Sequence, residues 1–133
     1  MSEPNISILV VDDEPAICRS LTAYLEDCGF SLQSATSAEK ALDIIRERHI
    51  DIVIVDLRLP CMSGDAMIAQ AHEIAPHVRY IIHTGSIGYS LSEELKKIGL
   101  SEENIFTKPI TNLTALVAAI RMMVKEKRNG NAR

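Results

Sequence analysis

The chain has 133 residues, of which 47% are apolar and 24% are charged, the composition of one ordinary globular domain. A chain of this length buries about two thirds of its unfolded surface in one core, so it needs no disulfide or metal to fold. The net charge of −4 argues against direct nucleic-acid binding, and no apolar run is long enough to span a bilayer. Residues 1–5 lack the features of a secretory signal, so we expect a cytoplasmic protein.

The first run, Ile6 to Val11, is apolar and rich in β-branched residues, which predicts a buried strand. It ends in acid, at Asp12-Asp13-Glu14. Pro15 suits a first helical turn, and the apolar spacing that follows predicts a helix over residues 16–28 with Gly29 as its stop. The chain therefore opens with a strand, an acidic loop and a helix.

Residues 30–35 predict a second, short strand. Thr36-Ser37-Ala38-Glu39 has the spacing of a capping box and predicts a second helix that continues through His49. The run Ile52-Val53-Ile54-Val55 is too short for a helix and too apolar for a half-exposed strand, so it predicts a strand buried on both faces. Asp56 follows it directly and so lies at the carboxyl end of a strand.

Pro60 ends any further strand pairing, and a third helix is predicted over residues 66–74. Residues 78–83 predict a fourth strand, which leads into Thr84-Gly85. Ser90-Leu91-Ser92-Glu93 has the spacing of a second capping box, for a short helix that ends near Gly99.

Residues 104–107 predict the fifth strand, and Lys108-Pro109 follows it. The last helix is predicted over residues 112–127. Five strands alternating with five helices predict an α/β fold: a doubly wound three-layer sandwich with one parallel sheet. We expect a domain at residues 6–127, flexible residues at 1–5, and a flexible tail or the start of a linker at 128–133.

Polar side chains follow four of the predicted strands, at Asp12-Asp13, Asp56, Thr84 and Lys108. Parallel strands place these ends at one edge of the sheet, where open α/β sheets bind ligands. Converging carboxylates repel one another unless a cation lies between them, and oxygen ligands without His or Cys favour Mg²⁺ or Mn²⁺. The edge therefore predicts a metal site.

Lys108 adds a positive charge for an anionic group at this edge, and Thr84 adds a hydroxyl donor. Such a set suits a phosphoryl group in transfer, because that group needs its oxygens neutralised more than it needs covalent help. We expect Asp56 to be the nucleophile, since a carboxylate can form an aspartyl phosphate.

Cys18, Cys28 and Cys61 are odd in number and lack Cys-x-x-Cys spacing, which argues against a disulfide framework and a zinc knuckle. The four histidines are scattered, without metal-ligand spacing. We expect His83 to point to the opposite side of its strand from Thr84.

The whole pattern closely resembles the receiver domain of two-component response regulators, over about residues 6 to 127. The segments that carry the likeness are Val10-Val11-Asp12-Asp13-Glu14, Asp56-Leu57-Arg58-Leu59-Pro60, Ser63-Gly64, Thr84-Gly85 and Lys108-Pro109. Membership would imply the flavodoxin-like strand order 2-1-3-4-5, for which receiver proteins are a standard example.

The resemblance also implies roles. Asp56 would be the phosphoacceptor. Asp13 and Asp56 would ligate Mg²⁺ directly, Asp12 would help through water, and the backbone carbonyl of Arg58 would complete the protein ligands. Thr84 would be the hydroxyl that moves toward the phosphoryl oxygens.

Lys108 would pair with those phosphoryl oxygens, and the peptide bond before Pro109 would be cis. The implied partners are a sensor histidine kinase or phosphotransfer protein, an effector domain or downstream protein, and a second copy bound through a face of the last helix. Such a domain is no enzyme in the usual sense, because it catalyses only its own phosphorylation and dephosphorylation.

The sequence departs from the family pattern at Ile105, where an aromatic switch residue is common, and at Cys61, where glycine is common. The stretch from Gly85 to Asn104 is slightly long. Two other functions are weighed. A pseudo-receiver would lack an acid or the lysine, and a haloacid-dehalogenase-like phosphatase needs a second Asp where Arg58 stands.

Overall fold

The computed structural model describes residues 5–85, 90–108, 110 and 112–131, with side chains described as far as Lys125. The strands are β1 (Ser7–Val11), β2 (Ser31–Ala35), β3 (Ile52–Val55), β4 (Arg79–Thr84) and β5 (Ile105–Thr107). The helices are α1 (Pro15–Asp27), α2 (Ala38–Glu47), α3 (Gly64–Ile74), α4 (Glu93–Ile98) and α5 (Leu113–Asn131). A short 3-10 helix, Glu102–Asn104, precedes β5.

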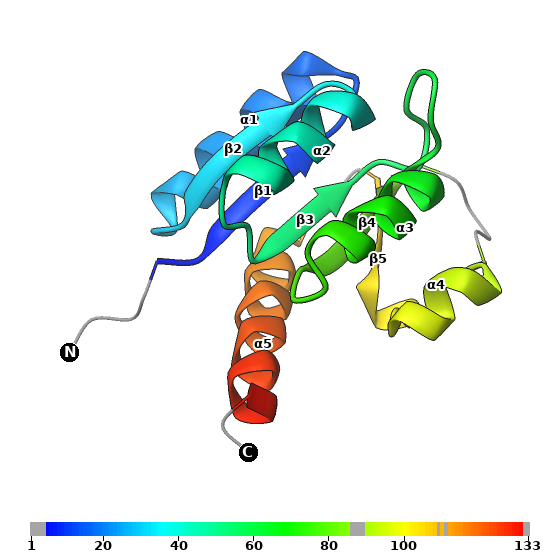
Figure 1. The fold of residues 1–133 in the computed structure, drawn as a ribbon. Helices are drawn as coiled ribbons and strands as arrows, with labels where there is room; N and C mark the ends of the chain where they lie inside the picture. The colour runs from blue at the N-terminus through cyan, green and yellow to red at the C-terminus, as the bar shows by residue number, and fades with distance from the viewer. Residues whose placement is uncertain (1–4, 86–89, 109, 111, 132–133) are drawn as a thin grey trace.

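The five strands form one parallel sheet in the order β2-β1-β3-β4-β5 (Figure 1). The register pairs Val11 with Val55 and Thr84 with Thr107. Neighbouring strands therefore end at nearly the same level, and the residues after them meet at one edge. The α/β doubly wound fold and its strand order are confirmed.

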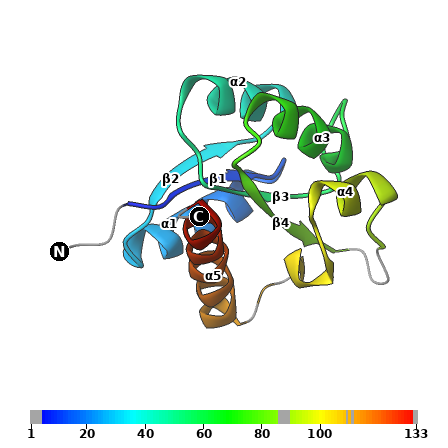
Figure 2. The same cartoon turned by 60° about the horizontal axis from the view of Figure 1, so that its bottom comes forward.

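Helices cover both faces of this sheet, as Figure 2 shows with α2, α3 and α4 above it and α1 and α5 below. Side chains alternate between the faces along each strand: Ile8 and Val10 pack toward α1 and α5, whereas Leu9 and Val11 pack toward the other three helices. The central strands therefore need an apolar residue at every position. This requirement explains the unbroken run that begins at Ile52.

The helix caps differ from those that the spacing predicted. Ser37, not Thr36, caps α2 by accepting the amide hydrogen of Lys40, and Ser92, not Ser90, caps α4. Neither helix has the predicted capping box, because Lys40 and Leu95 stand three residues after these caps, where the box needs Glu or Gln. A capping box does occur, between Ser101 and Asn104 of the 3-10 helix.

Three predicted helix boundaries need correction. α2 ends at Glu47 rather than continuing through His49, and Arg48, with its extended backbone, is its C-cap. α3 begins at Gly64 rather than at residue 66, because Ser63 caps it. α5 continues to Asn131, four residues past the predicted end at 127. The predicted end of α4 is confirmed at Gly99, whose φ of +116° favours glycine.

The predicted cis bond before Pro109 lies outside the described residues. None of the helices in the described part of the chain has the length and apolarity to cross a membrane.

Candidate functional site

Two acids follow β1. The amide of Asp12 donates to the carbonyl of Ala35 at 3.2 Å, which extends the pairing of β1 with β2 by one residue. This bond holds the Asp12 side chain inside the fold, where only 1% of the residue is exposed. Its Oδ1 accepts a hydrogen bond from the amide of Glu14 at 3.0 Å, while Asp13 is exposed.

Asp56 follows β3 and is positioned in the same manner. Its amide donates to the carbonyl of Val11 at 2.9 Å, so the backbone is still paired when the side chain reaches the sheet edge. The residue is 6% exposed. Its Oδ1 accepts the amide hydrogen of Arg58 at 3.1 Å, and Oδ2 faces Lys108.

Lys108 follows β5, and its amide donates to the carbonyl of Thr84 at 2.7 Å. Its Nζ donates to Oδ2 of Asp12 at 2.9 Å and to Oδ2 of Asp56 at 3.2 Å. Burial alone lowers the pKa of Lys108, but the hydrogen bond and charge of Asp12, with those of Asp56, outweigh it and raise the pKa above its ordinary value. The ammonium group is therefore charged and shared between two carboxylates.

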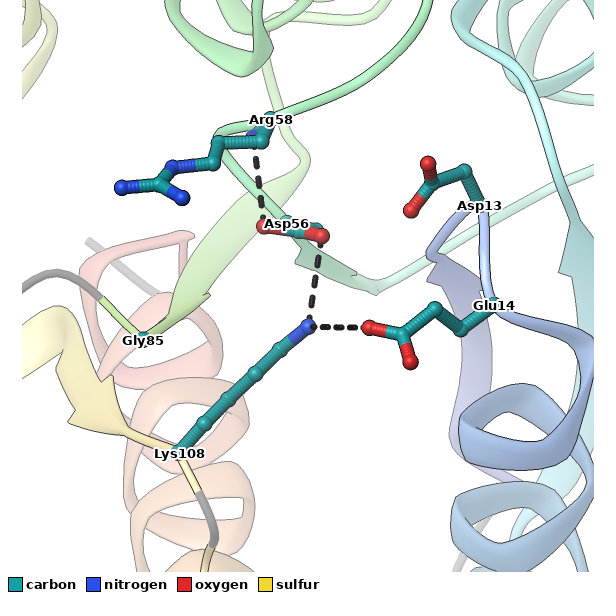
Figure 3. A pocket seen from close by; sticks show the side chains of 6 residues that line it. All are labelled: Asp13, Glu14, Asp56, Arg58, Gly85 and Lys108. Carbon is teal, nitrogen blue, oxygen red and sulfur yellow. Dashed lines mark hydrogen bonds and ion pairs between the residues drawn. The ribbon is translucent and has the colours of Figure 1, made fainter.

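These side chains border an open pocket of about 390 Å³. Its lining residues are Asp13, Glu14, Asp56, Arg58, Gly85 and Lys108 (Figure 3). In this view the Lys108 side chain points at Asp56, Asp13 and Glu14 lie on the β1 side, and the Arg58 guanidinium extends to the other side. The pocket therefore joins the ends of β1, β3, β4 and β5.

Asp12, Asp13 and Asp56 can each turn one carboxylate oxygen toward a common point, because those oxygens lie within 4.8 Å of one another. Three hard oxygen donors with a single adjacent ammonium group leave excess negative charge. This donor set fits a divalent cation such as Mg²⁺ and would hold it at the sheet edge. Whether the Arg58 carbonyl contributes stays a prediction.

Thr84 ends β4 and is 1% exposed. Its carbonyl accepts the amide hydrogen of Lys108, as described above, and the role of its hydroxyl stays a prediction.

His83 points to the other side of the strand, as expected, and lines a second cleft of about 330 Å³ with residues of α1 and α5. Burial and the nearby Lys108 charge lower the pKa of His83 to about 4.

Gly64 lies beside the site, and the sequence alone did not show why a glycine is needed there. A Cβ at this position would lie 2.7 Å from the carbonyl oxygen of Asp56 and 2.8 Å from Cα of Leu57. The glycine therefore allows α3 to pack directly against the backbone of the central aspartate. Glu14 also belongs to the site, although it was not predicted as a site residue: its Oε1 lies 3.8 Å from Nζ of Lys108. Its place in the acidic run was the only signal that could have included it.

The family of response regulator receiver domains matches residues 8–121 of this chain. This chain belongs to that family. Phosphorylation of an aspartate is the general function of receiver domains, which are signalling domains.

Similar proteins agree with this assignment. A CheY-like receiver domain protein from Methanospirillum hungatei JF-1 is 27% identical, with a TM-score of 0.82 over 96% of this chain and 99% of that one. A response regulator from Burkholderia pseudomallei, solved with a phosphorylated aspartic acid, a calcium ion and citrate, is 26% identical, with a TM-score of 0.77 over 96% of this chain and 74% of that one.

Among curated proteins, the transcriptional regulatory protein ZraR of Escherichia coli O157:H7 is 33% identical over 115 residues. The match covers 86% of this chain and 26% of ZraR, so the chain spans about a quarter of that relative's length. One family feature differs here: Ile105 occupies the place of the common aromatic residue and packs, partly buried, against the core beneath α2, α3 and α4.

Proposed function

We propose that this receiver domain takes a phosphoryl group onto Asp56 from a sensor histidine kinase or a phosphotransfer protein, in a Mg²⁺-dependent reaction. The observation that carries the proposal is the position of the Asp56 carboxylate, which is buried beside two further carboxylates and hydrogen-bonded to the Lys108 ammonium. The phosphorylated aspartic acid in the similar regulator from Burkholderia pseudomallei supports it.

In the proposed reaction an Asp56 oxygen attacks phosphorus, and the phosphorus–nitrogen bond of the donor's phosphohistidine breaks. The bond electrons return to that ring nitrogen, and the ring, which already carries a proton on its other nitrogen, leaves as neutral imidazole. Mg²⁺ held by Asp13, Asp56 and the Arg58 carbonyl, with Asp12 acting through water, would neutralise phosphoryl oxygens when bound. Lys108 exchanges its bond to Asp56 for one to a phosphoryl oxygen. Hydrolysis by water later returns Asp56 to its carboxylate.

The proposed output is a change of conformation that begins at Thr84. Its hydroxyl would move toward the phosphoryl group, and the change would reach an effector domain or a downstream protein. A second copy bound through α5 is a further proposed partner. Met122 on that helix is a large apolar residue with 58% of its surface exposed. Sedimentation before and after phosphorylation tests that contact.

The function is tested by incubating the protein with acetyl phosphate and Mg²⁺ and measuring its intact mass. We expect the mass of one added phosphoryl group, stable in acid and labile in base, as an acyl phosphate is. EDTA and the Asp56→Asn substitution should each abolish the gain. Equal labelling of the Asn variant would reject Asp56 as the acceptor.

A further inference from the structure

The second cleft, of about 330 Å³, is formed by α1, the end of β4 and the chain that leads from β5 into α5. The helices α1 and α5 cover the same face of the sheet (Figure 2). The lining residues of the cleft are Ala16, Ile17, Ser20, Leu21, His83, Lys108, Ile110 and Leu113. Lys108 is the one residue that also lines the pocket beside Asp56. The cleft is therefore a hollow distinct from that pocket.

Most of the lining of this cleft is apolar. Five of its eight residues are alanine, isoleucine or leucine. The one charged residue among the eight is Lys108, whose ammonium group is bound to Asp12 and Asp56. Ser20 is exposed, whereas His83 is only 5% exposed. Apolar walls with few polar groups are typical of sites that bind small molecules.

The buried polar group of the cleft is the imidazole of His83. Its Nε2 is buried and has no hydrogen-bond partner among the described residues. Burial, and then the charge of Lys108, lower the pKa of His83 to about 4, so the ring is neutral at pH 7. A buried water needs about three hydrogen bonds, and the side chains that line the cleft offer it few besides His83. Nε2 is therefore available to the polar group of an otherwise apolar ligand.

We propose that the cleft binds a small, uncharged, apolar molecule that carries one hydroxyl group, with this hydroxyl hydrogen-bonded to Nε2 of His83. A hydroxyl group both donates and accepts, so it suits either tautomer of the neutral ring. The apolar part of the ligand packs against Ile17, Leu21 and Leu113. A charged ligand is disfavoured, because the ammonium group of Lys108 is already paired. The proposed site does not depend on the function proposed above.

The volume of the cleft sets the size of the ligand. A cavity of about 150 Å³ in a protein interior holds benzene. This cleft has about twice that volume, so it has room for a substituted aromatic ring. p-Cresol is a suitable probe, because it is a single ring with one hydroxyl and one methyl group and is uncharged at pH 7. Toluene is its matched control, with the same ring and methyl group but no hydroxyl.

The test is a titration of the unphosphorylated, ¹⁵N-labelled protein with each compound, followed by the NMR shifts of the backbone amides. We expect p-cresol to shift the amides of Leu21, His83 and Leu113. Its dissociation constant should be about tenfold lower than that of toluene, since only p-cresol can satisfy the buried nitrogen. Equal affinities for the two compounds, or no shifts in the cleft with p-cresol, would overturn the inference.

Two variants test the role of His83. His83→Leu removes the hydrogen-bonding nitrogen and keeps an apolar lining, so toluene should still bind and the preference for p-cresol should disappear. Ser20→Ala is the matched control, because it removes the exposed hydroxyl of the same cleft and should keep the preference. A preference retained in His83→Leu would overturn His83 as the partner. The wild-type comparison decides the inference even if His83→Leu does not fold, and no result here bears on Asp56, because no phosphodonor is used.

Discussion

The ammonium nitrogen of Lys108 lies 3.2 Å from Oδ2 of Asp56, although 52 positions separate the two residues in the chain. The same nitrogen is bound more closely by Asp12, at 2.9 Å. Lys108 therefore holds the proposed acceptor and a proposed metal ligand together. A phosphoryl group or a cation must compete with this arrangement.

Replacing Lys108 should show how much its pairing with Asp12 and Asp56 stabilises the fold. Lys108→Met leaves the buried carboxylates of Asp12 and Asp56 without their positive partner, so we expect a loss of about 3 kcal/mol in the free energy of unfolding without metal. Mg²⁺ should stabilise this variant more than it stabilises the wild type. Urea unfolding with and without Mg²⁺ measures both quantities, and an unchanged metal-free stability would argue against the pairing.

Asp13 is expected to control metal binding. Mg²⁺ should bind weakly without phosphate, because few protein oxygens face it and the ion keeps several waters. Asp13→Ala should lose most of that binding and slightly raise the metal-free stability, since it removes one of three neighbouring negative charges. Thermal melts with and without Mg²⁺ test both expectations. If Mg²⁺ raises the melting temperature of the variant as much as that of the wild type, Asp13 is not a ligand.

Gly64 should tolerate no side chain. Gly64→Ala places a Cβ within 2.8 Å of backbone atoms of residues 56 and 57, so α3 must shift, at a cost of about 2 kcal/mol. Gly85→Ala is the matched control, because nothing lies within 4 Å of a Cβ there. The midpoints of denaturant unfolding should be measured for both variants. Equal midpoints would show that α3 can shift to admit the Cβ without loss of stability.

His83 predicts a pH dependence of stability. Burial first, and then the charge of Lys108, lower the pKa of His83 from 6.5 to about 4, while Asp12 and Asp56 act in the opposite direction. Between those pH values the unfolded chain binds a proton that the folded chain does not. Stability should therefore fall as the pH decreases from about 6.5 to about 4, by on the order of 3 kcal/mol from this group.

His83→Leu should remove that contribution, because leucine does not titrate and suits the apolar cleft beside Leu21 and Leu113. Urea unfolding at pH 6.5 and near pH 4.5 gives the loss for each protein. The variant should lose less stability than the wild type over this interval. Identical losses would mean that His83 is protonated in the folded state as readily as in the unfolded chain.

The sequence was most informative where one physical requirement acts on consecutive residues. A strand covered on both faces must be apolar throughout, so Ile52–Val55 was predicted with its bounds intact. Because parallel strands end at one edge, the meeting of Asp12, Asp56 and Lys108 could also be predicted. The resemblance to receiver domains added the strand order.

The features that escaped prediction depend on contacts between distant backbone segments. Nothing in the local sequence distinguishes Gly64 from a glycine that merely turns the chain. A glycine is needed there because the backbone of Asp56 lies too close for a side chain. The approach of Glu14 to Lys108 depends on the direction of a long side chain. The caps at Ser37 and Ser92 depend on where packing starts each helix.

The site of phosphorylation can be measured directly in the unmutated protein. Borohydride reduces an aspartyl phosphate to homoserine, so the protein is phosphorylated by a histidine kinase with Mg²⁺, reduced, digested and mapped by peptide mass spectrometry. We expect homoserine at position 56 alone, because, of these three acids, Asp56 is the one that both lines the pocket and accepts a hydrogen bond from Lys108. Homoserine at position 12 or 13, or at none of the three, would contradict the assignment of Asp56 as the phosphoacceptor.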